Sequence, residues 1–172
     1  KGGANLEASF DALRYGLPRP PVLAHRLDRD TSGCLVLGRH RKATASLGLL
    51  FKHGKIAKTY WAVVEGGPAQ DEGTIDMPLG RLTAERGWWQ KPDTEGQTAV
   101  TNWKVRGRGD GLCWLALEPV TGRTHQLRVH TSATGWPIVG DNIYGNGPRF
   151  GEPILHLHSR EIVVPISKNK EP

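Results

Sequence analysis

The chain has 172 residues, of which 37% are hydrophobic and 23% charged, and its formal net charge is +6. This composition supports a folded core and excludes a disordered tail, while 22 glycines and 12 prolines exclude a bundle of long helices. No run of about 20 apolar residues is present, which excludes a membrane-spanning helix.

The first third of the chain alternates helical and extended patterns. Apolar residues at helical spacing predict a helix over 5–15. Residues 34–39 form a short apolar segment that predicts a strand. A second helix is predicted over 42–53, with Gly54 as the residue that ends it.

The remainder of the chain is dominated by predicted strands. Residues 56–65 are rich in β-branched and aromatic side chains, and 98–106 with 112–119 read as a hairpin around a glycine-rich turn. A short helix is expected over 124–134 and a last strand over 154–164. The fold class predicted is α+β, with a mixed, largely antiparallel sheet and a few flanking helices in one domain over 1–172.

The charge is concentrated at the two ends of the chain. Residues 1–60 carry 11 basic and 4 acidic side chains, 61–100 carry 3 and 7, and 101–172 carry 9 and 6. A basic surface attracts nucleic acid or an anionic membrane face, although it also serves solubility. Only Cys34 and Cys113 are present, and the N-terminus shows no secretory leader, so we expect reduced thiols and a cytoplasmic protein.

The densest polar segment, HRLDRDTSG, lies at 25–33, directly before an apolar stretch. Its acidic spacing copies the start of a calcium loop, but the twelfth position is Arg39, where that loop needs a bidentate Glu. Calcium is therefore excluded. From the residues alone, Asp28 and Ser32 are best explained as turn formers that bond the local backbone.

Three other features have a structural and a functional explanation each. Arg128 is a permanent cation that could hold a carboxylate ionised by a bidentate contact. The histidine spacings lack acidic or Cys ligands nearby, so no metal site is predicted. Tyr60 is either an ordinary aromatic of the sheet or a stacking platform for a nucleobase.

Four motifs in the same order resemble the RluA family of RNA pseudouridine synthases. They are HRLDRDTSG at 25–33, KTYWA at 58–62, GRTHQLRVH at 122–130 and PIVGDNIYG at 137–145. The resemblance spans residues 20 to 160 and implies a pseudouridine-synthase-like catalytic domain. The family's strand before the first helix has no counterpart here, so we expect the N-terminal edge strand to be missing from this chain.

The resemblance also assigns roles to individual residues. It makes Asp28 the essential catalytic carboxylate, places Tyr60 against the target uracil as a candidate base, and pairs Arg128 with the carboxylate. Arg26 would enter the RNA where the target base has left. The expected RNA-binding set is Arg26, His25, Arg123 and His125. No metal or small-molecule cofactor is expected, and the partner is structured RNA, ribosomal or transfer RNA, bound by a monomer.

Two other functions remain open from the sequence. A hydrolytic N-glycosylase could use the same Asp28, and a catalytically silent RNA-binding module would keep the basic surface without the reaction. For the pseudouridine synthase, the resemblance leads to a definite prediction of how the site residues lie. Asp28 and Arg128 should form a direct ion pair at the floor of a basic cleft, with Tyr60 beside them.

Overall fold

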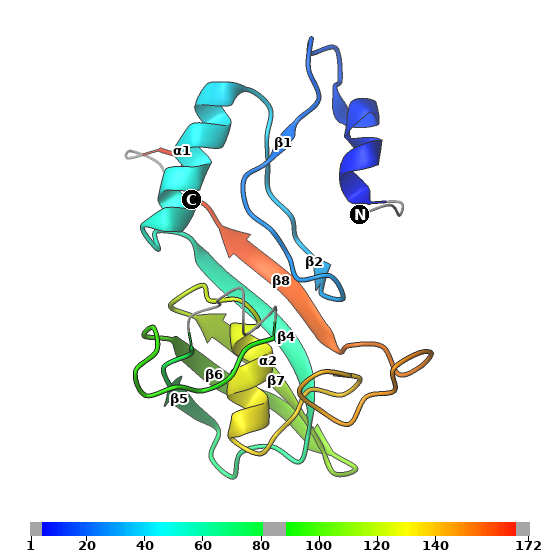
Figure 1. Cartoon of the computed structure of the whole chain (residues 1–172), viewed down its shortest axis with the longest axis vertical. Coiled ribbons are helices and arrows are strands. Elements are labelled where there is room, and N and C mark those ends of the chain that lie inside the picture. Colours follow the sequence, from blue (N-terminus) through cyan, green and yellow to red (C-terminus); the bar gives the residue numbers. More distant parts are fainter. Residues whose placement is uncertain (1–4, 81–88, 168–172) are drawn as a thin grey trace. The chain divides into compact units, whose positions relative to one another are not determined.

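The computed structural model describes residues 5–80 and 89–167, which group into two compact units. The first unit contains residues 1–27, 35–56 and 164–172, and the second contains 28–34 and 57–163. The chain therefore passes from the first unit to the second, where it forms strand β2 (Ser32–Gly33), and back to the first before strand β4 (Ala57–Glu65) begins (Figure 1). The prediction of a single catalytic domain stays a prediction.

The first unit holds two helices and a small ladder. The predicted helix at 5–15 is a 3-10 helix, η1 (Leu6–Leu13), whose first turn is capped by Asn5, because the Asn5 side chain accepts the Ala8 N–H at 3.0 Å. Strands β1 (Val22–Leu23) and β3 (Leu37–Gly38) pair antiparallel.

Helix α1 (Arg41–Lys52) confirms the prediction over 42–53. His40 caps it by accepting the Ala43 N–H at 3.2 Å, and Gly54 follows its end with φ +63°, a conformation that glycine adopts without strain. Gly38 lies so close to the helix that a Cβ there would stand 2.7 Å from the Thr44 Cα. This position therefore admits only glycine.

The second unit is built on a six-stranded sheet with the strand order β2-β8-β4-β7-β6-β5. All neighbouring pairs are antiparallel except β2 with β8. The predicted mixed, largely antiparallel sheet is confirmed. Its strands are β2 (Ser32–Gly33), β4 (Ala57–Glu65), β5 (Glu72–Asp76), β6 (Val100–Gly109), β7 (Leu112–Pro119) and β8 (Leu157–Val163).

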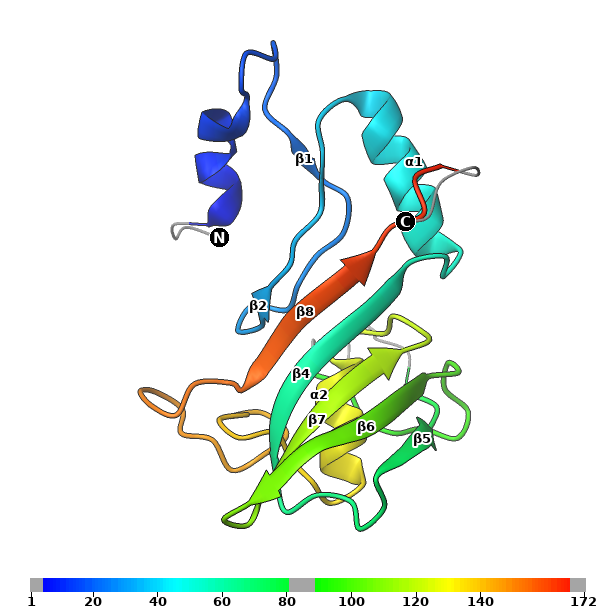
Figure 2. The same cartoon turned by 180° about the vertical axis from the view of Figure 1, so that it is seen from behind.

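The two faces of this sheet differ. Successive side chains of a strand point to opposite faces, so Ala62 and Val64 share one face of β4 and Trp61 and Val63 share the other. Helix α2 (Gln126–Ala133) packs on the first, and its Leu127 belongs to the same buried core as Ala62 and Val64. Figure 1 shows α2 in front of the sheet, and Figure 2 shows the opposite side. We call these the covered face and the open face.

Two strand predictions need correction. Of the apolar stretch 34–39, only Leu37–Gly38 is a strand, β3, which pairs with β1 in the first unit. Residues 34–36 are in neither strand, and the two-residue strand β2 (Ser32–Gly33) lies just before the predicted stretch and joins β8 in the second unit. The edge strand β5 was not predicted, since it contains a single large apolar residue, Ile75, and so shows no periodicity.

Among the described helices, none has the length and apolar character needed to cross a bilayer.

Candidate active site

Asp28 lies in the loop that leads into β2. The Thr31 N–H donates to the Asp28 carbonyl at 3.0 Å, which closes a turn, and Ser32 then joins the sheet beside His158. Within the described residues, no backbone N–H donates to the Asp28 carboxylate. The turn is therefore held by the main chain, and its geometry does not need the Asp28 side chain.

The predicted ion pair between Asp28 and Arg128 is wrong. Arg128 donates from Nε to Asp141 Oδ2 at 2.8 Å and from Nη2 to Asp141 Oδ1 at 2.7 Å. Both side chains are almost fully buried, at 2% and 1% exposure. A buried guanidinium needs a buried counter-charge, and Asp141 supplies it with the bidentate geometry that arginine favours.

The electrostatics of this pair follow from its hydrogen bonds. Burial opposes ionisation of Asp141, but the Arg128 hydrogen bond and the Tyr144 and Ile143 N–H groups outweigh it and lower the pKa of Asp141. Burial likewise opposes the charge of Arg128, whereas Asp141 and the nearby charge of Asp28 raise its pKa. Asp28 thus interacts with Arg128 through space, without contact.

His125 is the basic side chain that faces Asp28. Its Nε2 lies 4.0 Å from Asp28 Oδ1, and the two side chains are 13% and 23% exposed. Its Nδ1 is hydrogen-bonded to the Tyr144 hydroxyl at 2.7 Å. The pKa of Tyr144 is raised, mainly by burial, so the hydroxyl keeps its proton, while its oxygen accepts the Gln90 N–H at 2.8 Å.

This arrangement limits the hydrogen-bonding states of His125. The Tyr144 oxygen accepts from Gln90 and has a second lone pair, so the hydroxyl either donates its proton to Nδ1 or accepts one from it. In the tautomer in which Tyr144 donates, the ring proton resides on Nε2, the nitrogen that faces Asp28. His125 also has φ +52°, a left-handed conformation that is uncommon for a non-glycine residue and is typical of functional sites.

Tyr60 lies on the covered face of β4, packed against the buried core of the sheet. Burial raises the pKa of its phenol, the neighbouring Ser159 side chain opposes this, and the charge of Asp28 adds to the increase. The phenol is therefore protonated near neutral pH. Tyr60 and Asp28 are close enough to interact electrostatically, as predicted. Within the described residues, no hydrogen bond joins their side chains.

The expected RNA-binding residues are distributed over both units. His25 and Arg26 belong to the first unit, where His25 Nε2 accepts the Val36 N–H at 2.9 Å and its ring stacks on Phe51. Arg26 is exposed. In the second unit, the Arg123 Nε donates to the Thr98 carbonyl at 3.0 Å, so part of its guanidinium holds the local fold. RNA contact by these residues stays a prediction.

Helix α2 supports the site through a buried polar network. His130 is fully buried, with Nδ1 bonded to the Thr101 hydroxyl and Nε2 to the Met77 carbonyl, both at 2.9 Å. Because a carbonyl only accepts, Nε2 carries the proton and Nδ1 accepts from Thr101. Burial lowers the pKa of His130, so its ring is neutral.

Among residues 5–80 and 89–167, no three His, Cys, Asp or Glu side chains cluster as metal ligands.

Sequence reasoning missed two residues of this site, Asp141 and Tyr144. Both lie in the PIVGDNIYG motif, which contributed to the resemblance but received no role. The motif could therefore have drawn attention to both residues. Their function as the counter-charge of Arg128 and the hydrogen-bond partner of His125 depends on contacts between segments 13 and 19 residues apart.

Comparisons with known proteins agree on one family. Residues 3–133 match the sequence profile described as RNA pseudouridylate synthase. An uncharacterized RNA pseudouridine synthase of Zymomonas mobilis is 44% identical over 165 residues, which cover 94% of this chain and 75% of that protein. An uncharacterized RNA pseudouridine synthase of Synechocystis is 35% identical over 158 residues, covering 88% of this chain and 48% of that protein.

The fold agrees with a solved structure as well. Human RNA pseudouridylate synthase domain containing 1 superposes with a TM-score of 0.78 at 32% identity, over 93% of this chain and 69% of that one. The chain thus spans three quarters of the Zymomonas relative but about half of the Synechocystis one.

Proposed function

The chain belongs to the RluA family of RNA pseudouridine synthases, isomerases that convert uridine in RNA to pseudouridine, and we propose that it carries out this reaction with Asp28 as its catalytic carboxylate. The observation that supports this proposal best is the grouping around Asp28. Its charge acts on Tyr60, Arg128 and Tyr144, and His125 faces it at 4.0 Å.

The reaction needs few groups. The bond between uracil N1 and ribose C1′ breaks, the uracil turns, a bond forms between C5 and C1′, the C5 proton leaves, and N1 takes up a proton. The product is an isomer of the substrate and no electron is transferred, so no cofactor is required. The carboxylate of Asp28 either adds to C1′ or removes a ribose proton, and each route needs an ionised, accessible oxygen. The Asp28 side chain is 23% exposed in a loop, so its carboxylate is accessible to a substrate.

A hydrolytic glycosylase would need a second carboxylate placed across the glycosidic bond. The nearby acid, Asp141, is unsuited to that task. Both of its oxygens accept from Arg128, Oδ1 also accepts the Ile143 and Tyr144 N–H groups, and the side chain is 1% exposed. This observation favours the isomerase over the hydrolase.

Tyr60 and His125 then have separate tasks. The raised pKa of Tyr60 keeps its phenol protonated and makes it a poor base near neutral pH. We therefore assign its ring the task of stacking against the uracil. In the tautomer in which Tyr144 donates to Nδ1, His125 directs its Nε2–H toward Asp28 and stabilises the ionised carboxylate. Arg128 interacts with Asp28 through space, while its buried pair with Asp141 holds the guanidinium in place.

The substrate is a structured RNA, ribosomal or transfer RNA, bound by one copy of the chain. The net charge of +6 supports binding of a polyanion. A target uridine in folded RNA must leave its stack, at a cost of about a few kcal/mol. Stacking on Tyr60 would offset part of that cost. Arg26, which the resemblance expects to enter the RNA, is exposed. Mapping pseudouridines in cellular RNA with and without the protein identifies the uridine.

The test of the proposal is the Asp28→Asn variant, which keeps the size of the side chain and removes its charge. We expect release of tritium from RNA containing C5-labelled uridine to fall by about 10³-fold or more, with fold and RNA affinity retained. Asp30→Asn is the matched control, because Asp30 is exposed in the same loop and its ion pair among residues 5–80 and 89–167 is with the neighbouring Arg29, at 3.6 Å.

The outcomes separate the alternatives. Near-normal release by the Asp28→Asn protein overturns the proposal. Free uracil in place of the C5-linked product identifies a hydrolase. RNA binding by the unmodified chain without formation of any product identifies a silent binding module.

A further inference from the structure

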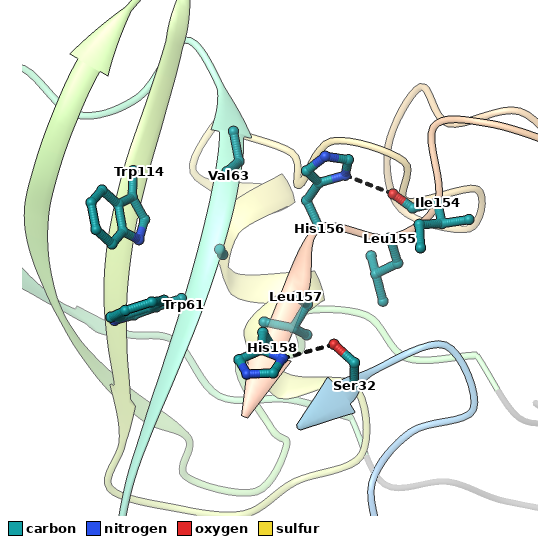
Figure 3. Close-up of a pocket in the computed structure, with 10 residues that line it drawn as sticks. Ser32, Trp61, Val63, Trp114, Ile154, Leu155, His156, Leu157 and His158 are labelled. Carbon is teal, nitrogen blue, oxygen red and sulfur yellow. Dashed lines mark hydrogen bonds between the residues drawn. The ribbon is translucent and has the colours of Figure 1, made fainter. Parts of the chain in front are cut away.

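A pocket lies on the open face of the sheet, on the side of β4 opposite to Tyr60. Its volume is about 310 Å³, at the lower end of the range for small-ligand sites. Figure 3 shows the side chains around it, contributed by β2, β4, β7, β8 and the segment before β8. The main features of its lining are Trp61, Trp114, His156, His158, Ser32 and Ile154.

Two indole rings form the aromatic part of the pocket. Trp61 and Trp114 are diagonal neighbours on adjacent strands and meet edge to face, with centroids 5.0 Å apart and planes at 86°. Trp114 is 39% exposed. Its partner on β6 is Gly107, where even a Cβ would stand 3.8 Å from the indole, so no side chain at that position covers the ring. An indole face is thus available for stacking.

The polar side chains in and beside the pocket are hydrogen-bonded or lie on an aromatic ring. Arg160 is not one of the lining residues, but it lies over the lining residue Trp61, with its guanidinium carbon 4.9 Å from the ring centroid. His158 Nδ1 is hydrogen-bonded to the Ser32 hydroxyl at 2.9 Å, and His156 Nδ1 donates to the Ile154 carbonyl at 2.7 Å. None of the residues lining the pocket is acidic. The site therefore suits a flat group attached to a negatively charged chain.

We propose that this pocket binds one unpaired nucleobase of the RNA, stacked on Trp114, with Arg160 contacting the neighbouring phosphate. Aromatic rings combined with arginine recognise single-stranded nucleotides in this way. The inference rests on the proposed function, because it takes RNA as the partner. It adds a second contact on the face away from Asp28, and Ser32 connects the pocket to the catalytic loop, four residues after Asp28.

The proposal is tested by following the indole N–H resonances in a nitrogen-15 NMR spectrum. Single-residue Trp→Phe variants assign the six tryptophans. Short single-stranded oligouridylate and oligoadenylate are the probes. We expect the Trp61 and Trp114 signals to shift on titration, whereas those of Trp103 and Trp136, which pack against each other at 5.3 Å, remain unchanged.

Two variants give a matched comparison. Leu112 and Trp114 lie on the same face of β7 and are equally exposed, at 39% each. Trp114→Ala should weaken binding of the oligonucleotides by about tenfold, since stacking contributes about 1–3 kcal/mol per base. Leu112→Ala should leave the affinity unchanged. Arg160→Gln should reduce the dependence of affinity on salt by about one phosphate contact.

Three results would overturn the proposal. The first is RNA binding without a shift at Trp61 or Trp114, and the second is an equal loss of affinity in Leu112→Ala and Trp114→Ala. The third is a concentration-dependent dimer in sedimentation that Trp114→Ala abolishes, because the open face would then bind a second copy of the chain. Tritium release by the unmodified chain is measured separately, so failure of the pocket is distinguished from failure of the isomerase.

Discussion

The covered and open faces of the sheet carry different kinds of side chain although they share the same strands. On the covered face, charged and polar groups are buried in pairs, such as Arg128 with Asp141 and His130 with Thr101. On the open face, Trp114 is exposed and Arg160 lies over an aromatic ring. A change on the covered face should therefore affect folding and chemistry together, whereas a change on the open face should affect binding.

The largest expected effect is that of Asp141→Asn. This change leaves the Arg128 guanidinium buried without a counter-charge, and we expect the free energy of unfolding to fall by about 3–5 kcal/mol. Urea unfolding followed by circular dichroism measures it. Asp30→Asn removes an exposed carboxylate and should change stability by less than about 0.5 kcal/mol. Similar losses in both variants would mean that the buried pair has no special importance.

A smaller effect separates two adjacent residues of β4. Tyr60→Ala removes the ring proposed to stack on the target uracil, and we expect kcat to fall by about 5- to 150-fold, equivalent to about 1–3 kcal/mol. Trp61→Ala acts on the opposite face and should raise KM more than it lowers kcat. Steady-state kinetics of tritium release measures both constants. An identical pattern for the two variants would remove the functional distinction between the faces.

The smallest effect concerns the pH dependence of stability. The folded chain holds His130 neutral with a pKa below its ordinary value of 6.5, so the unfolded chain binds more protons near that pH. The free energy of unfolding should therefore decrease as the pH is lowered through about 6.5, and His130→Gln should reduce this decrease. Urea unfolding at several pH values between about 7 and 5 gives the slope. The exposed His53→Gln serves as control, and an unchanged slope in the His130 variant would contradict the neutral, buried ring.

The sequence by itself determined the elements that have a strong periodic or propensity signal. Helix α1 and strands β4, β6, β7 and β8 lie within a few residues of their predicted bounds, because their β-branched, aromatic or helically spaced apolar residues report local conformation. Helix α2 was found from its position after a turn, although six of its eight residues are buried and four of those six are polar. The motifs identified the family and directed attention to Asp28, Tyr60 and Arg128.

Only the tertiary structure decided which of these residues meet. A guanidinium pairs with whichever carboxylate the fold buries beside it, and for Arg128 that is Asp141, thirteen residues along the chain, in place of Asp28. The partner of Asp28 is His125, because Tyr144 and a left-handed backbone direct its ring there. The assignment of β2 and β3 to two different ladders and the exposure of Trp114 on the open face have the same origin. Local pattern reports which conformation a segment favours, whereas pairing depends on distances that are set when distant segments pack together.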